Sequence, residues 1–213
     1  MKTYPDPDTG GSVPVLDVDD LTIDQGAHIA IEGPSGSGKT TLLHILSGLI
    51  LPDSGSVKIL DTEIQQLGEA HRDRFRGRHI GYIFQSFNLL EGFTALENVM
   101  LGMMFGTGKT DRSRAARLLD TVGLANRLGY RPSQLSTGQQ QRVCIARALA
   151  NNPEIILADE PTGNLDPAAS ADVLNLLDEV TTGKTLVLVS HEHDVLMRYS
   201  SRISSLTFKT AEA

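Results

Sequence analysis

The chain has 213 residues, of which 40% are hydrophobic, enough to bury the core of one sizeable domain. Its 26 acidic residues outnumber its 19 basic ones, and the formal net charge of −7 argues against binding nucleic acid by bulk attraction, so we expect no nucleic-acid partner. The single cysteine, Cys144, excludes an internal disulfide and a multi-cysteine zinc site. Apolar runs are too short to span a membrane, and the polar start lacks a signal peptide's apolar core. We therefore expect a cytoplasmic protein.

Short apolar runs rich in β-branched residues predict buried strands at residues 28–32, 57–60, 80–84, 155–158 and 185–189. Between them, apolar residues recur at helical spacing in segments that begin at Leu42, Ala115 and Val173. Asp166 before Pro167 indicates a helix start, and Gly123 indicates a helix end. Alternating strands and helices predict a single, largely parallel α/β domain over residues 1–213. No strand pattern occurs from 86 to 151, which predicts an inserted helical lobe between catalytic parts 1–85 and 152–213.

The sequence GPSGSGKT at residues 33–40 matches the phosphate-loop motif G-x-x-x-x-G-K-[ST] between a predicted strand and a predicted helix. Glycines let successive backbone N–H groups turn toward one anion. Lys39 is expected to reach the β- and γ-phosphates, and the Thr40 hydroxyl to bind Mg²⁺. The motif alone does not separate kinases, GTPases, motors and transporters. The expected nucleotide contacts are Gly33, Ser35, Gly36, Ser37, Gly38, Lys39, Thr40 and Thr41.

The segment LSTGQQQR at residues 135–142 opens a helix rich in small residues and resembles the LSGGQ signature of ABC ATPases. This resemblance implies the ABC ATPase fold, in which a RecA-like P-loop NTPase core with a mainly parallel sheet carries an N-terminal antiparallel β portion and an inserted helical subdomain. It also implies a homodimer with two ATP molecules between the chains, where Ser136, Gly138 and Gln139 act on the opposite chain's nucleotide. Thr137 departs from the usual glycine, and its β-branched side chain is expected to affect the tightness of this sandwich. Ser136 could instead only cap its helix.

Two carboxylates end the apolar segment 155–158, and they match the family's Walker B element. The resemblance gives Asp159 a place in the Mg²⁺ shell through water, and Glu160 the role of polarising or deprotonating the attacking water. In-line attack on a γ-phosphate needs an oriented water, a proton acceptor and a cation. Without the other motifs, an acidic pair at a strand end would be interpreted as a helix cap or a solvated turn.

Four further positions match motifs of the same family. Gln85 follows a predicted strand and matches the glutamine that reaches Mg²⁺ or the attacking water, and His191 matches the switch histidine that hydrogen-bonds the γ-phosphate. Asp166, in GNLD, matches the loop that runs along the dimer interface. Tyr4 lies at a distance suited to the aromatic that stacks on adenine. Family members usually have a strand ahead of this aromatic, whereas only residues 1–3 precede it here, so we expect it to be weakly anchored.

Two stretches, IGYIFQSFNLLEGFTALENVM and DEPTGNLD, resemble the lipoprotein-releasing, macrolide-exporting and division-associated ABC ATPases named LolD, MacB and FtsE. The resemblance implies ATP and Mg²⁺ as cofactors, a separate permease of MacB or FtsX type, a periplasmic adaptor, and a peripheral position on the inner face of the membrane. It leaves two functions open: driving transport, lipoprotein release or mechanical work, or activating a cell-wall hydrolase without transport. Residues 86–90 either line the groove for the permease's coupling helix or pack internally. The basic stretch of Arg72, Arg74, Arg76 and Arg78 is interpreted as solvated surface.

Overall fold

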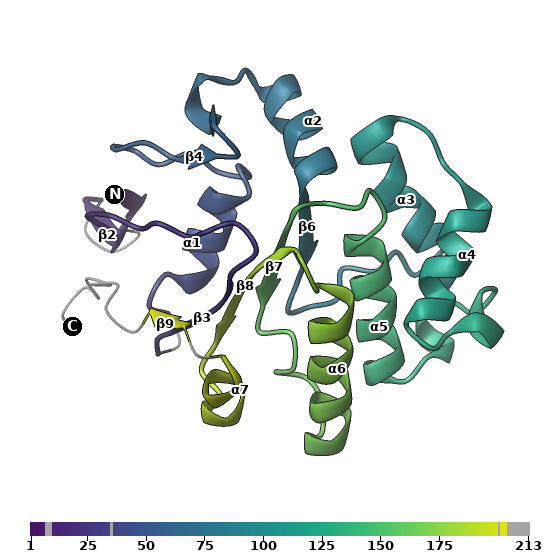
Figure 1. Cartoon of the computed structure of the whole chain (residues 1–213). Coiled ribbons are helices and arrows are strands. Elements are labelled where there is room, and N and C mark those ends of the chain that lie inside the picture. Colours follow the sequence, from purple (N-terminus) through teal and green to yellow (C-terminus); the bar gives the residue numbers. More distant parts are fainter. Residues whose placement is uncertain (7–9, 35, 200, 204–213) are drawn as a thin grey trace.

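The computed structural model describes residues 1–6, 10–34 and 36–199, and the backbone of 201–203. At its centre is a five-stranded parallel sheet with strand order β6-β7-β8-β3-β9, and helices cover both of its faces (Figure 1). This arrangement confirms the predicted parallel α/β core. The strands span β3 His28–Glu32, β6 Ile80–Ile83, β7 Ile155–Asp159, β8 Thr185–Ser190 and β9 Ser201–Ile203.

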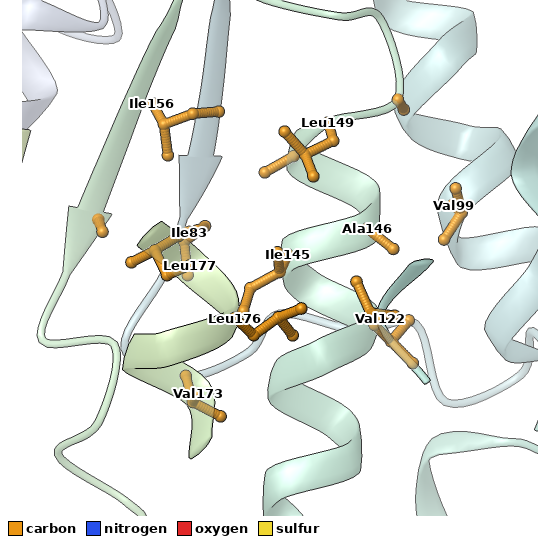
Figure 2. Packing of buried hydrophobic residues seen from close by; sticks show 14 of the residues in the cluster. Ile83, Val99, Val122, Ile145, Ala146, Leu149, Ile156, Val173, Leu176 and Leu177 are labelled. Carbon is orange, nitrogen blue, oxygen red and sulfur yellow. The ribbon is translucent and has the colours of Figure 1, made fainter. Parts of the chain in front are cut away.

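Alternate residues of the central strands point to opposite faces of the sheet and contribute to two separate apolar clusters. Ile156 and Ala158 of β7 face the cluster that includes helices α5 (Thr137–Ala148) and α6 (Pro167–Val180), while Leu157 faces the cluster that includes α1 (Lys39–Leu46). Figure 2 shows the first cluster, where Ile145 of α5 lies beside Leu176 of α6, and Leu177 of α6 lies near Ile83 of β6. Both faces of the sheet are therefore buried, as is typical of parallel sheets.

Two antiparallel pairs lie outside the central sheet. The first joins β1 (Lys2–Pro5) to β2 (Ser12–Leu16), and the second joins β4 (Lys58–Ile59) to β5 (Thr62–Glu63). The strand predicted at residues 57–60 corresponds to β4 and is shorter than predicted, because Leu60 and Asp61 turn the chain with φ values of 47° and 64°. The strands β1, β2 and β5 have no counterpart among the strands predicted from the apolar runs.

The expectation that Tyr4 is weakly anchored is wrong. Tyr4 lies within β1 and pairs with Val13 of β2. The Asp53 carboxylate fixes the same strand from the other side, because it accepts hydrogen bonds from the Lys2 ammonium at 2.6 Å and from the Thr3 backbone N–H at 2.7 Å. The aromatic is thus itself part of a paired strand.

The segment from 86 to 151 contains three α-helices and no strand. Thr94 begins α3 with a reciprocal capping box to Glu97, and Asp111 begins α4 by accepting the Arg114 N–H. The predicted helix end at Gly123 is confirmed by its φ of 77°, and Asp166 caps α6 through the N–H groups that follow Pro167. The bounds of the remaining helices are α2 Glu69–His79, α3 Ala95–Thr107, α4 Arg112–Thr121, α7 His193–Arg198, and the 3-10 turns η1 Ile64–Gln66, η2 Ala125–Arg127 and η3 Pro132–Gln134.

Across the ranges that the structure describes, no helix has both the length and the apolar character needed to cross a membrane. The four arginines between 72 and 78 lie on α2, whose residues are exposed or half-buried.

Candidate nucleotide site

The polar residues of the site follow the carboxyl ends of neighbouring parallel strands. The phosphate loop follows β3, Gln85 follows β6, Glu160 follows β7 and His191 follows β8. Because these strand ends meet at one edge of the sheet, residues far apart in the chain converge there. They form a pocket of about 260 Å³, called here the phosphate pocket, which is lined by Val15, Gly36, Gly38, Lys39, Thr40, Thr41, Gln85, Glu160 and His191.

The phosphate loop wraps around the buried side chain of Lys39. Its ammonium donates hydrogen bonds to the carbonyls of Gly33 at 2.7 Å and Pro34 at 2.9 Å, and it lies 3.8 Å from Glu160 Oε1. Gly36 and Gly38 have φ values of 77° and 92°, a conformation that side chains with a Cβ disfavour. The predicted contact Ser35 lies outside the described residues, and Ser37 is buried with its N–H bonded to Pro34. The backbone carbonyls of the loop therefore hold the Lys39 ammonium in place.

Glu160 and His191 form a pair inside the phosphate pocket. His191 Nδ1 lies 2.9 and 2.8 Å from the two carboxylate oxygens of Glu160, so this nitrogen carries the donated proton. Glu160 is buried and has a φ of 45°, which is rare for a residue other than glycine. Its own N–H is held by the Val189 carbonyl. Such strain persists where surrounding contacts fix the backbone, and it aims this carboxylate at the pocket.

Asp159 and Thr40 place two hard oxygen donors together beside that pair. The Thr40 hydroxyl donates to Asp159 Oδ1 at 3.2 Å. Burial raises the pKa of Asp159 above its usual value, and the bond from Thr40 opposes this rise. The backbone carbonyl of Gln85 accepts a hydrogen bond from Asn164 Nδ2 at 2.7 Å, which fixes the start of its loop. Oxygen donors of this kind suit Mg²⁺.

The signature residues lie in a different pocket of about 260 Å³ at the start of α5, called here the signature pocket. Ser136 Oγ accepts the Gln139 N–H at 3.3 Å, and Gln139 Oε1 accepts the Ser136 N–H at 3.1 Å, so both residues form a capping box. Thr137 is the first residue of the helix, and its side chain is exposed. Its backbone does not adopt a positive φ, so the position does not require glycine. The pocket is lined by Gly123, Leu124, Ser136, Gly138, Gln139, Arg142, Ala169, Asp172 and Val173.

Among the described residues, five predicted site residues line neither pocket: Gly33 and Ser37 of the phosphate loop, Asp159, Tyr4 and Asp166. Tyr4 is 38% exposed on β1, with the Lys2 ammonium 5.7 Å from its ring centroid. Asp166 is exposed and caps α6, the helix whose Ala169 and Asp172 line the signature pocket. The structure therefore brings Lys39, Thr40, Gln85, Glu160 and His191 together and leaves Ser136 and Gly138 at a separate site.

Sequence reasoning missed two residues of the phosphate pocket's surroundings. Val15 of β2 lines the pocket, and no signal marked it because the strand Ser12–Leu16 was not predicted. Asn164 belongs to the GNLD segment, where only Asp166 was singled out, and its amide holds Gln85. Cys144 is buried, in agreement with a structural role.

Comparison with known proteins gives consistent matches. Residues 16–163 match the family described as ABC transporter. A Thermotoga maritima protein named as an uncharacterized ABC transporter ATP-binding protein is 51% identical over 81% of this chain and 75% of its own length. The lipoprotein-releasing system ATP-binding protein LolD of Geobacter metallireducens is 47% identical over 89% and 86% of the two chains.

Two further matches concern a longer protein and a solved structure. The macrolide export ATP-binding/permease protein MacB of Rhodopseudomonas palustris is 48% identical over 84% of this chain, which spans only 28% of that relative. The dimeric, post-hydrolysis structure of an ATP-binding cassette bound to ADP and Pi superposes with a TM-score of 0.86 and 39% identity over 95% and 90% of the two chains. With both pockets and these matches in agreement, the chain belongs to the ABC transporter family, as an ATP-binding cassette that hydrolyses ATP.

Proposed function

We propose that the phosphate pocket binds the ATP phosphates with Mg²⁺ and that Glu160 is the catalytic base. The supporting observation is the convergence of Lys39, Thr40, Glu160 and His191 in one pocket. The glycine turns leave room for phosphate oxygens, and the Thr40 hydroxyl beside the Asp159 carboxylate, with Gln85 nearby, suits the cation. When bound, Mg²⁺ supplies neutralisation of the charge that develops on the phosphate oxygens.

In this mechanism the residues of the phosphate pocket have different tasks. Lys39 exchanges its bonds to the loop carbonyls for bonds to the phosphates. The Glu160 carboxylate orients the attacking water and accepts its proton. His191 holds Glu160 through Nδ1 and contacts the γ-phosphate, while Gln85 completes the positioning of water or cation. Tyr4 contributes stacking on the adenine.

We further propose that a complete site needs two copies of the chain. The phosphate pocket and the signature pocket share no lining residue, so each copy supplies two separate halves. Ser136, Gly138 and Gln139 of one copy then close on the nucleotide held by Lys39 of the other. Asp166 lies at the interface beside α6. The dimeric state of the similar cassette structure supports this arrangement.

Mixing two inactive variants tests this arrangement. Lys39→Ala leaves the signature pocket intact, and Ser136→Glu leaves the phosphate pocket intact, so neither homodimer has a complete site. An equal mixture should recover roughly a quarter of wild-type phosphate release, since half of the dimers are mixed and each has one complete site. If the mixture stayed as inactive as its components, the site would not be shared between chains.

We also propose that an apolar groove receives a transmembrane permease. The groove has a volume of about 550 Å³ and is lined by Leu49, Phe84, Leu90, Leu101 and Phe105, among others. Phe105 is 74% exposed and Leu90 is 49% exposed. Such an exposed apolar surface is typical of a protein contact. Of the loop 86–90, Asn88 and Leu90 line the groove, while Leu89 packs against the internal cluster.

The groove lies between α2 and α3, so it joins the proposed catalytic part, residues 1–85 and 152–213, to the proposed helical lobe, residues 86–151. We propose a permease of the MacB or FtsX type, which would place this chain on the cytoplasmic face of the membrane. The experiment is co-purification with the native membrane partner, comparing wild type with Phe105→Ser. Loss of the partner and of its stimulation of ATP turnover is expected, while retention of both would exclude the groove as the contact.

A further inference from the structure

The turn that follows Gln85 has an unusual backbone. Phe87 and Asn88 are consecutive residues with φ values of 56° and 51°, and the Asn88 N–H donates to the Ser86 carbonyl across the turn. Left-handed backbone is tolerated by asparagine but disfavoured for a bulky residue such as phenylalanine. A conformation of this kind persists only when surrounding contacts determine it.

Two side chains of α5 supply those contacts. Arg147 Nη2 donates to the Phe87 carbonyl at 2.6 Å, and Nη1 donates to the Asn88 carbonyl. Cys144 Sγ lies 3.2 Å from the same Phe87 carbonyl. Cys144 and Arg147 are three positions apart and so lie on one face of the helix. The planar guanidinium can bond two adjacent carbonyls at once, which the single ammonium of lysine cannot do with the same geometry.

Both groups are in the forms that donate. Burial raises the pKa of the Cys144 thiol to about 12, so the sulfur retains its proton at neutral pH. It also lowers the pKa of Arg147, but an arginine side chain remains protonated in proteins. Neither group has a task in the proposed hydrolysis mechanism.

The contacts link two parts of the proposed mechanism. Helix α5 has Ser136 as its N-cap and is 12 residues long, so the signature and the Phe87 turn lie at opposite ends of a rigid rod of about 18 Å. On the far side of the turn, buried Asn98 of α3 accepts the Leu90 N–H at 2.8 Å and donates to the Leu90 carbonyl at 3.2 Å. Asn88 and Arg147 also line the proposed permease groove.

We propose that Arg147, supported by Cys144, is a positioning residue that holds the Phe87–Asn88 turn and thereby fixes Gln85 relative to the signature of the same chain. The functional part of this inference rests on the proposed role of Gln85.

The contacts by which Arg147 holds the Phe87–Asn88 turn, called here the clamp, can be tested without ATP, by hydrogen exchange on the intact chain. Arg147→Met keeps the apolar stem but removes both donors, and the amides of residues 86–90 should exchange about tenfold faster. Arg142→Met is the matched control, since Arg142 lies on the same helix and bonds the Val122 carbonyl. It should leave residues 86–90 unchanged. Equal exchange of this segment in wild type and Arg147→Met would overturn the clamp.

The effect of the clamp on catalysis is tested by steady-state ATP turnover and by the Mg²⁺ concentration for half-maximal rate. Arg147→Met should lower kcat about tenfold and raise that Mg²⁺ concentration, while ATP binding to the monomer and the melting temperature stay near wild type. Arg147→Lys should recover part of the loss. Faster exchange with unchanged kcat and Mg²⁺ dependence would overturn the link to Gln85. Absence of ATP turnover in the wild type would instead overturn the proposed hydrolysis mechanism and leave the exchange result standing.

Discussion

The phosphate pocket takes its residues from widely separated parts of the chain, whereas the signature pocket centres on one short motif at the start of α5. The first is positioned by the register of parallel strands, which brings the residues after β3, β6, β7 and β8 to one edge. The second is positioned by a helix cap, in which Ser136 and Gln139 bond each other's backbone. A substitution in the phosphate pocket should therefore change the rate of ATP hydrolysis, whereas a substitution in the signature pocket should change dimerisation.

The largest effect is expected for Glu160→Gln, which should leave ATP binding intact and slow phosphate release by about 100-fold or more, because the amide cannot accept the water's proton. An ATP-dependent dimer should accumulate, measurable by size-exclusion chromatography. Glu192→Gln is the matched control. Glu192 accepts the Thr162 hydroxyl at 3.0 Å and should retain turnover within about twofold. Normal turnover of Glu160→Gln would remove the catalytic assignment.

The variant Ser136→Ala tests the role of the signature pocket in dimerisation. Loss of the hydroxyl should weaken ATP-dependent dimerisation about tenfold, since a bond to a charged phosphate is lost. It also removes a helix cap worth about 1 kcal/mol. Asp111→Ala removes a comparable cap from α4, where Asp111 accepts the Arg114 N–H at 2.9 Å. Both variants should melt lower, but only Ser136→Ala should dimerise poorly; equal dimerisation would reduce Ser136 to a cap.

A smaller effect is expected outside both pockets, for Asp53→Asn. The hydrogen bond from Lys2, with those from Thr3, lowers the pKa of Asp53 from 3.8 to about 2. Because the folded pKa is the lower one, this support of β1 is present above pH 4 and is lost as the pH falls through 2. The variant should loosen Tyr4 and weaken ATP binding about threefold by calorimetry. A carboxyl titration by NMR with its midpoint near 4 would contradict this anchoring.

The smallest effect is expected for Thr137→Gly, which restores the residue usual in the family. Thr137 already occupies an exposed helical position, so dimer affinity should change by less than about threefold. Sedimentation of the ATP-bound Glu160→Gln dimer, with and without the second substitution, measures it. A large gain in affinity would show that the side chain obstructs the nucleotide, in line with the effect expected from sequence.

The sequence predicts the elements and the site residues well where a motif or an apolar run marks them. The run from 28 to 32 matches β3 at both ends, and the 3.6-residue spacing after Val173 corresponds to α6. The strand pair β1–β2 was expected only from the family resemblance, as an N-terminal antiparallel portion. No apolar run marked it, because its stability depends on Asp53, a residue about 50 positions away in the chain, and on half-buried side chains without a strong pattern. Arg147 gave no signal, because its role depends on the left-handed turn at Phe87. Long-range polar contacts of this kind leave no local periodicity to detect.

The left-handed backbone of Glu160 has a consequence for the evolution of this chain. A non-glycine residue at a φ of 45° lowers the free energy of unfolding by about 1 kcal/mol relative to a residue that tolerates it. Glycine or asparagine at position 160 would relieve that strain and remove the carboxylate. With Glu160 as the proposed catalytic base, selection for thermal resistance alone would favour sequences that have lost hydrolysis, and selection for ATP turnover would be needed to retain the glutamate.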